Sequence, residues 1–312
     1  MKRYITVDCG TTNTRVFLVE VDKIVSHSSL SVGAKNCFED RTSFTAVLKA
    51  EIDSLIKKNL LFEKDIEAII LSGMITSELG LCTVEHIKAP AGKAELNKGL
   101  VLRDVGISSL PCYFIPGVKT NAATLDATDM MRGEEAELMG LIRKGDGECV
   151  YVLPGSHSKH IIVDSEGRIS DFGTFLSGEL IAALANHTIL KDSVSLDIES
   201  FDEEYLLTGY DYAKKYGISA TLFKTRIANR LFGLNPIQCY SFFMGAVLEN
   251  EISAVTKYGK KKIMIGGKAS LREPMRFIIE NRTELEVGTY SDDETKFATA
   301  LGAVKIFTFK GE

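Results

Sequence analysis

The chain has 312 residues, of which 45% are hydrophobic and 25% are charged, and its formal net charge is -5. This composition is typical of a folded globular protein, and the length suits two domains with a cleft between them better than a single core. The negative net charge argues against non-specific binding to nucleic acid. The sequence has no charge-free apolar run of about 18 residues and no signal peptide, so we expect a cytoplasmic protein that does not bind a membrane.

The cysteines are scattered singly, without a C-x-x-C pair or a cluster of histidines beside them. This spacing predicts free, mostly buried thiols rather than a zinc site or a disulfide framework. The six cysteines are Cys9, Cys37, Cys82, Cys112, Cys149 and Cys239.

The chain opens with a predicted hairpin, in which a strand over residues 4–7 ends at Asp8 and a second strand covers residues 14–19. The small residues of the turn allow backbone amides and side-chain donors to surround an anion. A carboxylate beside a bound phosphate implies an intervening Mg²⁺, held through water, so Asp8 is the candidate metal residue. The alternative is an ordinary hairpin with an acid at its mouth. The candidate phosphate-binding residues are Gly10, Thr11, Thr12 and Asn13.

The motif D-x-G-T-T-N-T after an N-terminal strand resembles the first phosphate motif of the actin, heat-shock chaperone and sugar kinase superfamily. ATP sites in that superfamily are built from two such turns. The resemblance therefore implies a second strand, turn and strand further along the chain.

The next segments predict an α/β domain with a mixed sheet. Residues 23–27 are predicted as a strand, residues 43–58 as a helix and residues 65–72 as a buried strand that ends at Gly73. Ligands of such sheets lie outside the carboxyl ends of strands, where Asp8 and residues 72–74 both fall. Residues 76–110 are predicted as loop with short helical pieces, and a strand over residues 112–115 follows.

Residues 119–129 form a polar run that we expect to be an exposed loop beside a site. It leads to Asp129, Arg132, Glu134 and Glu135, and a helix follows. Acids in a first helical turn stabilise the helix dipole by about 0.3–1 kcal/mol, which is the structural alternative to a role in the site. Arg132 beside a glycine at this turn is better suited to meet an anion than to cap the helix.

The second strand, turn and strand unit follows, with strands predicted over residues 148–154 and 160–163 and a donor-rich turn between them. Two such units about 145 residues apart suggest an internal pseudo-repeat, one in each domain. The candidate phosphate-binding residues of this turn are Gly155, Ser156, Ser158 and Lys159, and His157 is a candidate for the substrate.

Ser177 begins a predicted helix to about residue 186, where helix capping and anion binding are both open explanations for the serine. Helices over residues 201–216 and 220–231 are predicted as a lid or surface layer, followed by a long helix over residues 237–257. A strand over residues 260–264 then precedes the glycine-rich turn, and residues 294–307 form a closing helix with small residues for close packing. In the superfamily such a turn contacts adenosine, which implies this role for Gly266, Gly267 and Ser270.

The motifs MRGEE (residues 131–135), LPGSHSK (153–159), FLSGEL (175–180) and DCGTTNTR (8–15) occur together, and the chain resembles the 2-dehydro-3-deoxygalactonokinases. The resemblance implies two actin-like ATPase domains with mixed sheets and a nucleotide cleft between them. It also implies ATP and Mg²⁺ as cofactors and phosphorylation of the terminal hydroxyl of 2-dehydro-3-deoxy-D-galactonate in galactonate catabolism. We expect one domain over residues 1–118, with the helix 293–312 able to pack back on it, and one over residues 119–292 with a helical insertion at about 195–235.

A keto-acid substrate needs its carboxylate held and its hydroxyl deprotonated. Arginine is best shaped to grip a carboxylate, so Arg15 and Arg132 are the candidates. Glu134 is the predicted general base, with Asp129 in reserve, because Asp8 is assigned to the metal. The alternatives are a kinase for another keto-acid or polyol and a non-catalytic nucleotide-binding regulator. A homodimer is a further expectation.

Overall fold

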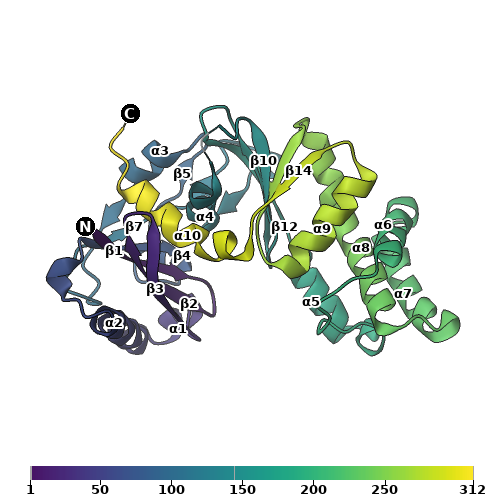
Figure 1. Ribbon diagram of the computed structural model, residues 1–312, viewed down its shortest axis with the longest axis horizontal. Helices are drawn as coiled ribbons and strands as arrows, with labels where there is room; N and C mark the ends of the chain where they lie inside the picture. The colour runs from purple at the N-terminus through teal and green to yellow at the C-terminus, as the bar shows by residue number, and fades with distance from the viewer. Residues whose placement is uncertain (1, 144, 312) are drawn as a thin grey trace. The chain divides into compact units, whose positions relative to one another are not determined.

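The computed structural model describes residues 2–143 and 145–311 (Figure 1). The chain divides into two compact units. Unit 1 comprises Met1–Asp146, Asp164–Asp171 and Asp293–Glu312, and unit 2 comprises Gly147–Val163 and Phe172–Asp292. Each unit combines a mixed sheet with helices, which confirms the expected α/β class.

The main sheet of unit 1 has the strand order β3-β2-β1-β4-β7-β6. β1 pairs antiparallel with β2, and it pairs parallel with β4 on its other side. Both predicted strands of the opening hairpin are therefore confirmed, and the carboxyl ends of β1 and β4 meet at one edge. The strands are β1 Arg3–Cys9, β2 Thr14–Glu20, β3 Lys23–Leu30, β4 Ala68–Gly73, β6 Val101–Leu102 and β7 Cys112–Phe114.

Two helices cover opposite faces of this sheet. The side chains of Ile5 and Val7 join the core cluster that includes Leu48 of α2. Tyr4 points to the other face, where its ring lies 5.6 Å from that of Phe307 in α10. Neighbouring residues of a strand face opposite sides, so the continuous apolar run of β1 is explained by burial on both faces.

The remaining elements of unit 1 are shorter. A small sheet has the order β5-β8-β9, with β5 Ile87–Lys88, β8 Val118–Lys119 and β9 Met130–Met131. The pairing of β8 with β9 and the packing of α4 against α10 place residues 119–146 in unit 1, beyond the boundary expected near residue 118. The helices are α1 Ala34–Glu39, α2 Arg41–Lys58, α3 Lys93–Lys98, α4 Glu134–Leu141 and α10 Asp292–Phe307.

The sheet of unit 2 has the order β12-β11-β10-β13-β14. β10 and β11 form the second predicted hairpin, and β10 pairs parallel with β13. Strand β12 was not predicted, because the polar residues and the glycine in its sequence ISDFGTF leave only a weak apolar signal. The strands are β10 Cys149–Leu153, β11 Ser158–Val163, β12 Ile169–Phe175, β13 Lys262–Ile265 and β14 Glu286–Thr289.

The long helix α8 is the centre of the helical layer of unit 2. Its residues from Cys239 to Leu248 are all buried, and it packs along α6, as Figure 1 shows. Its apolar residues, among them Phe243 and Ile252, share a core cluster with Val150 and Val152 of β10. The helices are α5 Ser177–His187, α6 Glu203–Tyr216, α7 Ile218–Phe232, α8 Pro236–Val255 and α9 Ala269–Arg282.

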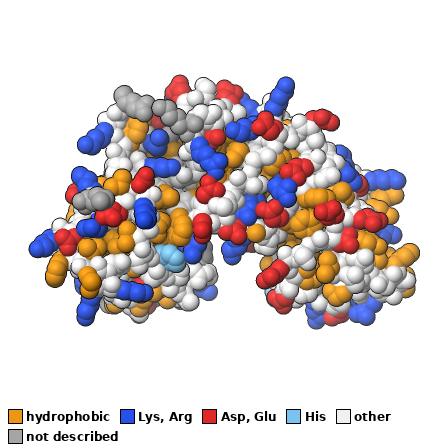
Figure 2. Space-filling model, in the orientation of Figure 1, with side chains coloured by type: hydrophobic (Ala, Val, Ile, Leu, Met, Phe, Trp, Pro, Cys, Tyr) orange, Lys and Arg blue, Asp and Glu red, His pale blue; other side chains and the backbone are white. Residues whose placement is uncertain are grey.

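The surface carries charges of both signs. On the face seen in Figure 2, Lys and Arg side chains are interspersed with Asp and Glu rather than gathered in one basic patch. Among the described residues, no helix is long and apolar enough to cross a bilayer.

The helices α4 and α10 approach each other through glycines, which leads to a first prediction. A Cβ atom at Gly302 would lie 1.8 Å from the carbonyl oxygen of Ala136, and one at Gly140 would lie 2.0 Å from that of Ala298. Gly302→Ala is therefore expected to lower the free energy of unfolding by about 1–3 kcal/mol or more, because the helices must separate. Urea denaturation measures this change. Lys296→Ala, at an exposed position of α10, should stay within about 0.5 kcal/mol of wild type, and an equally stable Gly302→Ala variant would contradict the packing argument.

Candidate active site

The candidate site of unit 1 is built around Asp8 at the end of β1. Asp8 lies opposite Arg15 of β2 and beside Ser72 of β4 in the sheet register. The Arg15 guanidinium donates to the Asp8 carboxylate, with Nε 3.0 Å from Oδ2. The side chains of Asp8 and Arg15 are 15% and 42% exposed, so the pair remains open to a ligand. Arg15, expected to grip a substrate carboxylate, therefore also orients the candidate metal residue.

The first turn is anchored by backbone hydrogen bonds, and its residues are exposed to solvent. The backbone N–H groups of Ala34 and Lys35 donate to the carbonyls of Gly10 and Thr11, each at 3.0 Å. Helix α1, which the sequence analysis missed, thus anchors the turn. The four residues Gly10, Thr11, Thr12 and Asn13 are all exposed. Their exposure leaves these predicted phosphate contacts geometrically accessible.

Two glycines bring further backbone up to Asp8. Gly73 has φ +79°, and a Cβ atom there would lie 2.5 Å from the Cys9 carbonyl oxygen and 3.4 Å from Asp8 Oδ1. Gly133 has φ +110°, and its Cβ would lie 3.2 Å from the Cα of Gly73. Only glycine suits such positions, since both the backbone conformation and the space exclude a side chain. The start of α4 is therefore stacked on Gly73 next to Asp8.

The acids at the start of α4 are bound to its backbone. Glu134 accepts a hydrogen bond from the Arg132 N–H at 3.0 Å, and both carboxylate oxygens of Glu135 lie 2.8 Å from the Gly133 nitrogen. Glu135 is fully buried, and its burial, with the nearby charge of Glu134, raises its pKa from 4.5 to about 8. Glu135 is thus a structural acid, whereas Glu134 remains partly exposed.

Glu137 is a site residue that the sequence analysis missed. It lies three residues after Glu134, on the same face of α4. Burial raises its pKa to about 7, and the charges of Glu134 and Asp8 add to this effect while Arg15 opposes it. We call the three acids Asp8, Glu134 and Glu137, together with their neighbour Arg15, the acid cluster. A carboxyl group with a pKa near 7 can both take up and release a proton at neutral pH, which suits general base chemistry.

The Arg132 guanidinium is hydrogen-bonded to the segment of residues 76–86. Its guanidinium Nη1 donates to the Thr76 carbonyl at 2.7 Å, and Nη2 donates to the Val84 carbonyl at 2.8 Å and lies 3.2 Å from His86 Nδ1. The side chain thereby fixes residues 76–86 against the start of α4. The predicted contact with a substrate carboxylate stays a prediction. Asp129 ends the exposed loop, and its carboxylate accepts from the Met130 N–H at 2.7 Å.

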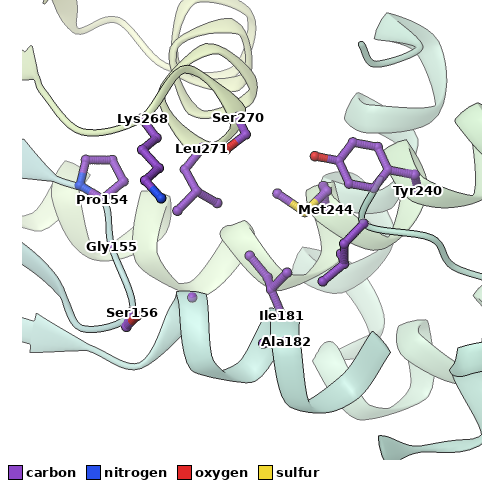
Figure 3. Close-up of a pocket in the computed structure, with 12 residues that line it drawn as sticks. Pro154, Gly155, Ser156, Ile181, Ala182, Tyr240, Met244, Lys268, Ser270 and Leu271 are labelled. Atoms are coloured by element: carbon purple, nitrogen blue, oxygen red, sulfur yellow. The ribbon is translucent and has the colours of Figure 1, made fainter. Parts of the chain in front are cut away.

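The candidate site of unit 2 is a pocket of about 350 Å³ at the second turn (Figure 3). Its volume lies in the range of small-molecule sites. The predicted phosphate turn and the predicted adenosine turn both line it, and Figure 3 shows the Lys268 side chain extending into it from the start of α9. Lys268 is exposed and was missed as a site residue. The lining residues include Pro154, Gly155, Ser156, Gly178, Lys268 and Ser270, together with the largely apolar side chains of Ile181, Leu196, Tyr240, Met244 and Leu271.

Close backbone contacts shape this pocket. A Cβ atom at Gly178 would lie 2.3 Å from the Gly155 carbonyl oxygen, so the start of α5 touches the second turn. Gly267 has φ +73°, and its Cβ would lie 2.6 Å from the Pro154 carbonyl oxygen. Gly266 is buried and donates its N–H to Val152. The glycine-rich turn is thus required for the close approach of α9 to the second turn.

The other predicted residues of unit 2 differ in exposure. His157 is exposed, with Nε2 2.9 Å from Glu179 Oε1. Lys159 is only 4% exposed, and its ammonium donates to the His157 carbonyl at 3.2 Å. The hydroxyls of Ser158 and Ser177 are buried and donate to the carboxylate of Glu251. Direct ligand contacts of Lys159, Ser158 and Ser177 stay predictions.

Comparisons with known proteins identify the family of this chain. A profile of the 2-keto-3-deoxy-galactonokinase family matches residues 8–300. The 2-dehydro-3-deoxygalactonokinase of Escherichia coli K12 is 27% identical over 261 residues, covering 82% of this chain and 81% of the relative. A crystal structure described as a 2-dehydro-3-deoxygalactonokinase protein from Sinorhizobium meliloti superposes with a TM-score of 0.79 at 24% identity, covering 98% of this chain and all of that one.

A more distant structure has the same fold. The activator of the 2-hydroxyisocaproyl-CoA dehydratase from Clostridium difficile, with bound ADPNP, superposes with a TM-score of 0.53 at 13% identity and covers 97% of this chain and 93% of its own. The protein therefore has the fold of the actin-like ATPases and sugar kinases. Within that class, the chain belongs to the 2-keto-3-deoxy-galactonokinase family, which confirms the resemblance carried by its motifs.

The buried acid Glu135 leads to a prediction on stability and pH. The pKa of Glu135 is raised on folding, so the stabilisation that its protonated form gives the folded state is complete below about pH 4.5. This stabilisation is lost as the pH rises through about 8. In Glu135→Gln this titration is absent. Between pH 5 and 8, the free energy of unfolding of this variant should fall less steeply with pH than that of the wild type. The two slopes should differ by up to about 1.4 kcal/mol per pH unit. Urea denaturation at pH 5, 6, 7 and 8 measures the slopes, and parallel curves for the two proteins would refute the assignment.

Proposed function

We propose that this protein is a kinase that transfers the γ-phosphoryl group of ATP to the terminal (C6) hydroxyl of 2-dehydro-3-deoxy-D-galactonate, in the catabolism of D-galactonate. The observation that carries this proposal is the family match over residues 8–300, a range that includes both turns and the acid cluster. The E. coli relative carries the name of this activity. A cytoplasmic homodimer is part of the proposal, and light scattering would test the dimer.

The proposal assigns ATP to the turns. The pocket of unit 2 offers apolar side chains such as Tyr240 and Met244 for the adenine and polar groups of the glycine-rich turn for the ribose. The phosphates would meet the exposed first turn and the second turn, with the Lys268 ammonium as an added positive charge. These contacts suit phosphoryl transfer, in which the protein acts mainly by positioning the reacting groups and neutralising their charge.

Magnesium fits the residues present. Among residues 2–143 and 145–311, no group of three or more His, Cys, Asp or Glu is arranged to hold a metal ion. Mg²⁺ retains several waters and is commonly bound by one or two carboxylates together with substrate phosphates, so Asp8 alone is an adequate protein partner. Bound there, Mg²⁺ would neutralise charge on the phosphates. Arg15 would hold the Asp8 carboxylate in its orientation.

The acid cluster supplies a base for the acceptor. As the acceptor oxygen bonds to the γ-phosphorus, the bond to the bridging oxygen of ADP breaks and the hydroxyl proton passes to a carboxylate. Glu134 is the proposed base, with Asp129 in reserve, and Glu137 interacts electrostatically with Glu134 and Asp8. Arg15, Arg132 and His157 remain the proposed substrate contacts. The predicted substrate contact of Ser177 is not part of the proposal, because its buried hydroxyl donates to Glu251.

The test is a panel of sugar acids and polyols with coupled detection of ADP. The proposed acceptor should give the highest kcat/KM, because contacts with its stereocentres contribute about 1–3 kcal/mol each. Higher activity on another keto-acid or polyol would identify a different kinase of the superfamily. Nucleotide binding without turnover on any member of the panel would favour a regulator instead.

Replacing Asp8 tests the metal role. Asp8→Asn keeps the side-chain volume but removes the charge that Mg²⁺ needs, so kcat should fall at least about 100-fold while the melting temperature changes little. Turnover is measured over a range of Mg²⁺ concentrations, and circular dichroism checks the fold. A kcat near that of wild type at saturating Mg²⁺ would exclude this role of Asp8.

Three variants compare the candidate bases. Glu134→Gln should lower kcat by about 10²–10⁴-fold with little change in the KM for ATP, the usual effect of losing a general base. Glu137→Gln and Asp129→Asn should each retain more of kcat than Glu134→Gln. If one of these two is the inactive variant and Glu134→Gln is not, the base is that residue instead.

A further inference from the structure

A buried carboxylate is hydrogen-bonded to two segments that line the pocket of unit 2. Glu251 of α8 is only 1% exposed. The Ser158 hydroxyl and the His160 ring, whose Nε2 is 3.0 Å away, donate to Oε1, and the Ser177 hydroxyl donates to Oε2. A buried carboxylate without partners would cost several kcal/mol, and these donors offset that cost. The three donors around Glu251 therefore favour a carboxylate at this position.

The two serines belong to the two segments that bound the pocket. Ser158 ends the second turn and begins β11, and Ser177 is the first residue of α5. The segments also touch directly, because the Glu179 N–H donates to the Ser156 carbonyl at 3.3 Å. Glu251 thus joins the turn and the helix start through one side chain that comes from a third element.

His160 completes the arrangement. Its ring is fully buried between Phe175 and Tyr258, with ring centroids 4.5 Å and 5.8 Å away. Its Nδ1 has no hydrogen-bond partner among the described residues. Nε2 is therefore the ring nitrogen whose proton faces the carboxylate, since a proton on Nδ1 would be buried without an acceptor. His160 therefore donates to Glu251 and fixes one side of the carboxylate.

We propose that Glu251 is a positioning residue for the nucleotide phosphates. It turns the hydroxyls of Ser158 and Ser177 inward and sets the distance between the second turn and α5. Phosphate oxygens are then met by the backbone N–H groups of the turn and by the exposed Ser156 hydroxyl. This assignment differs from the direct contacts expected for Ser158 and Ser177, and it rests on the proposed function for the identity of the ligand as ATP.

The test measures binding of a non-hydrolysable ATP analogue to the full chain by calorimetry in the presence of Mg²⁺. Glu251→Gln keeps the size of the side chain but cannot accept from all three donors, so the dissociation constant should rise about tenfold or more. Glu249→Gln is the matched control, because Glu249 is on the same helix and accepts from the Ser253 hydroxyl at 2.6 Å. It should change the constant less than about twofold.

A double-mutant cycle separates positioning from direct contact. Ser177→Ala should weaken analogue binding severalfold in the wild-type background and less than about twofold together with Glu251→Gln, because both act through the same contact. Binding of the keto-acid should be unchanged in Glu251→Gln, which a general loss of structure would not allow. An unchanged analogue constant in Glu251→Gln, or additive effects in the cycle, would overturn the proposal.

Two further outcomes concern a variant that does not fold and a wild type without kinase activity. If Glu251→Gln does not fold, Ser158→Ala and Ser177→Ala are combined instead: coupled effects on analogue binding support the shared carboxylate, and additive effects reject it. If the wild type binds the analogue but phosphorylates no sugar acid, the proposed function fails, whereas the role of Glu251 is still judged by the binding data.

Discussion

The candidate site of unit 1 depends on the absence of side chains where its backbone segments meet. Gly73 leaves room for the carbonyl of Cys9, Gly133 stacks on Gly73, and a Cβ atom at Gly33 would lie 2.6 Å from the carbonyl oxygens of Gly10 and Thr11. These contacts bring the first turn, the end of β4 and the start of α4 to the same end of the sheet. Parallel pairing of β1 with β4 supplies the edge, and the glycines permit the approach.

This convergence places carboxylates closer together than their charges favour. Burial raises the pKa of Glu137 to about 7, and the charges of Glu134 and Asp8 add to this effect. Arg15 and the N-terminal end of α4 provide partial compensation, since a helix N-terminus favours negative charge. A surface without a ligand role would gain from removing one of these acids. Acids with a raised pKa beside an open turn are typical of functional sites.

The sequence allowed both hairpins, the helix after Gly133 and the family to be predicted, because each depends on local pattern or on a short motif. It did not reveal which way individual polar side chains point. Arg132 follows the predicted loop, yet its guanidinium is bound to carbonyls of residues 76–86, about fifty positions earlier. Glu137 and Lys268 carry no motif of their own, and their roles follow from neighbours in space. Helix α1 and strand β12 were missed because they are short or polar on one side.

The two hairpins resemble each other in sequence pattern, but the structure supports their turns differently. The first turn is anchored through its carbonyls, which accept from the backbone N–H groups at the start of α1, and all of residues 10–13 remain exposed. The second turn is anchored partly through its backbone, because the Ser156 carbonyl accepts from the Glu179 N–H, and partly through the Ser158 hydroxyl, which donates to the buried carboxylate of Glu251. Anchoring through backbone leaves the side chains of the first turn available as donors. The contact with Glu251 commits the Ser158 hydroxyl to the interior, so the sequence of the second turn is also constrained by a residue of α8.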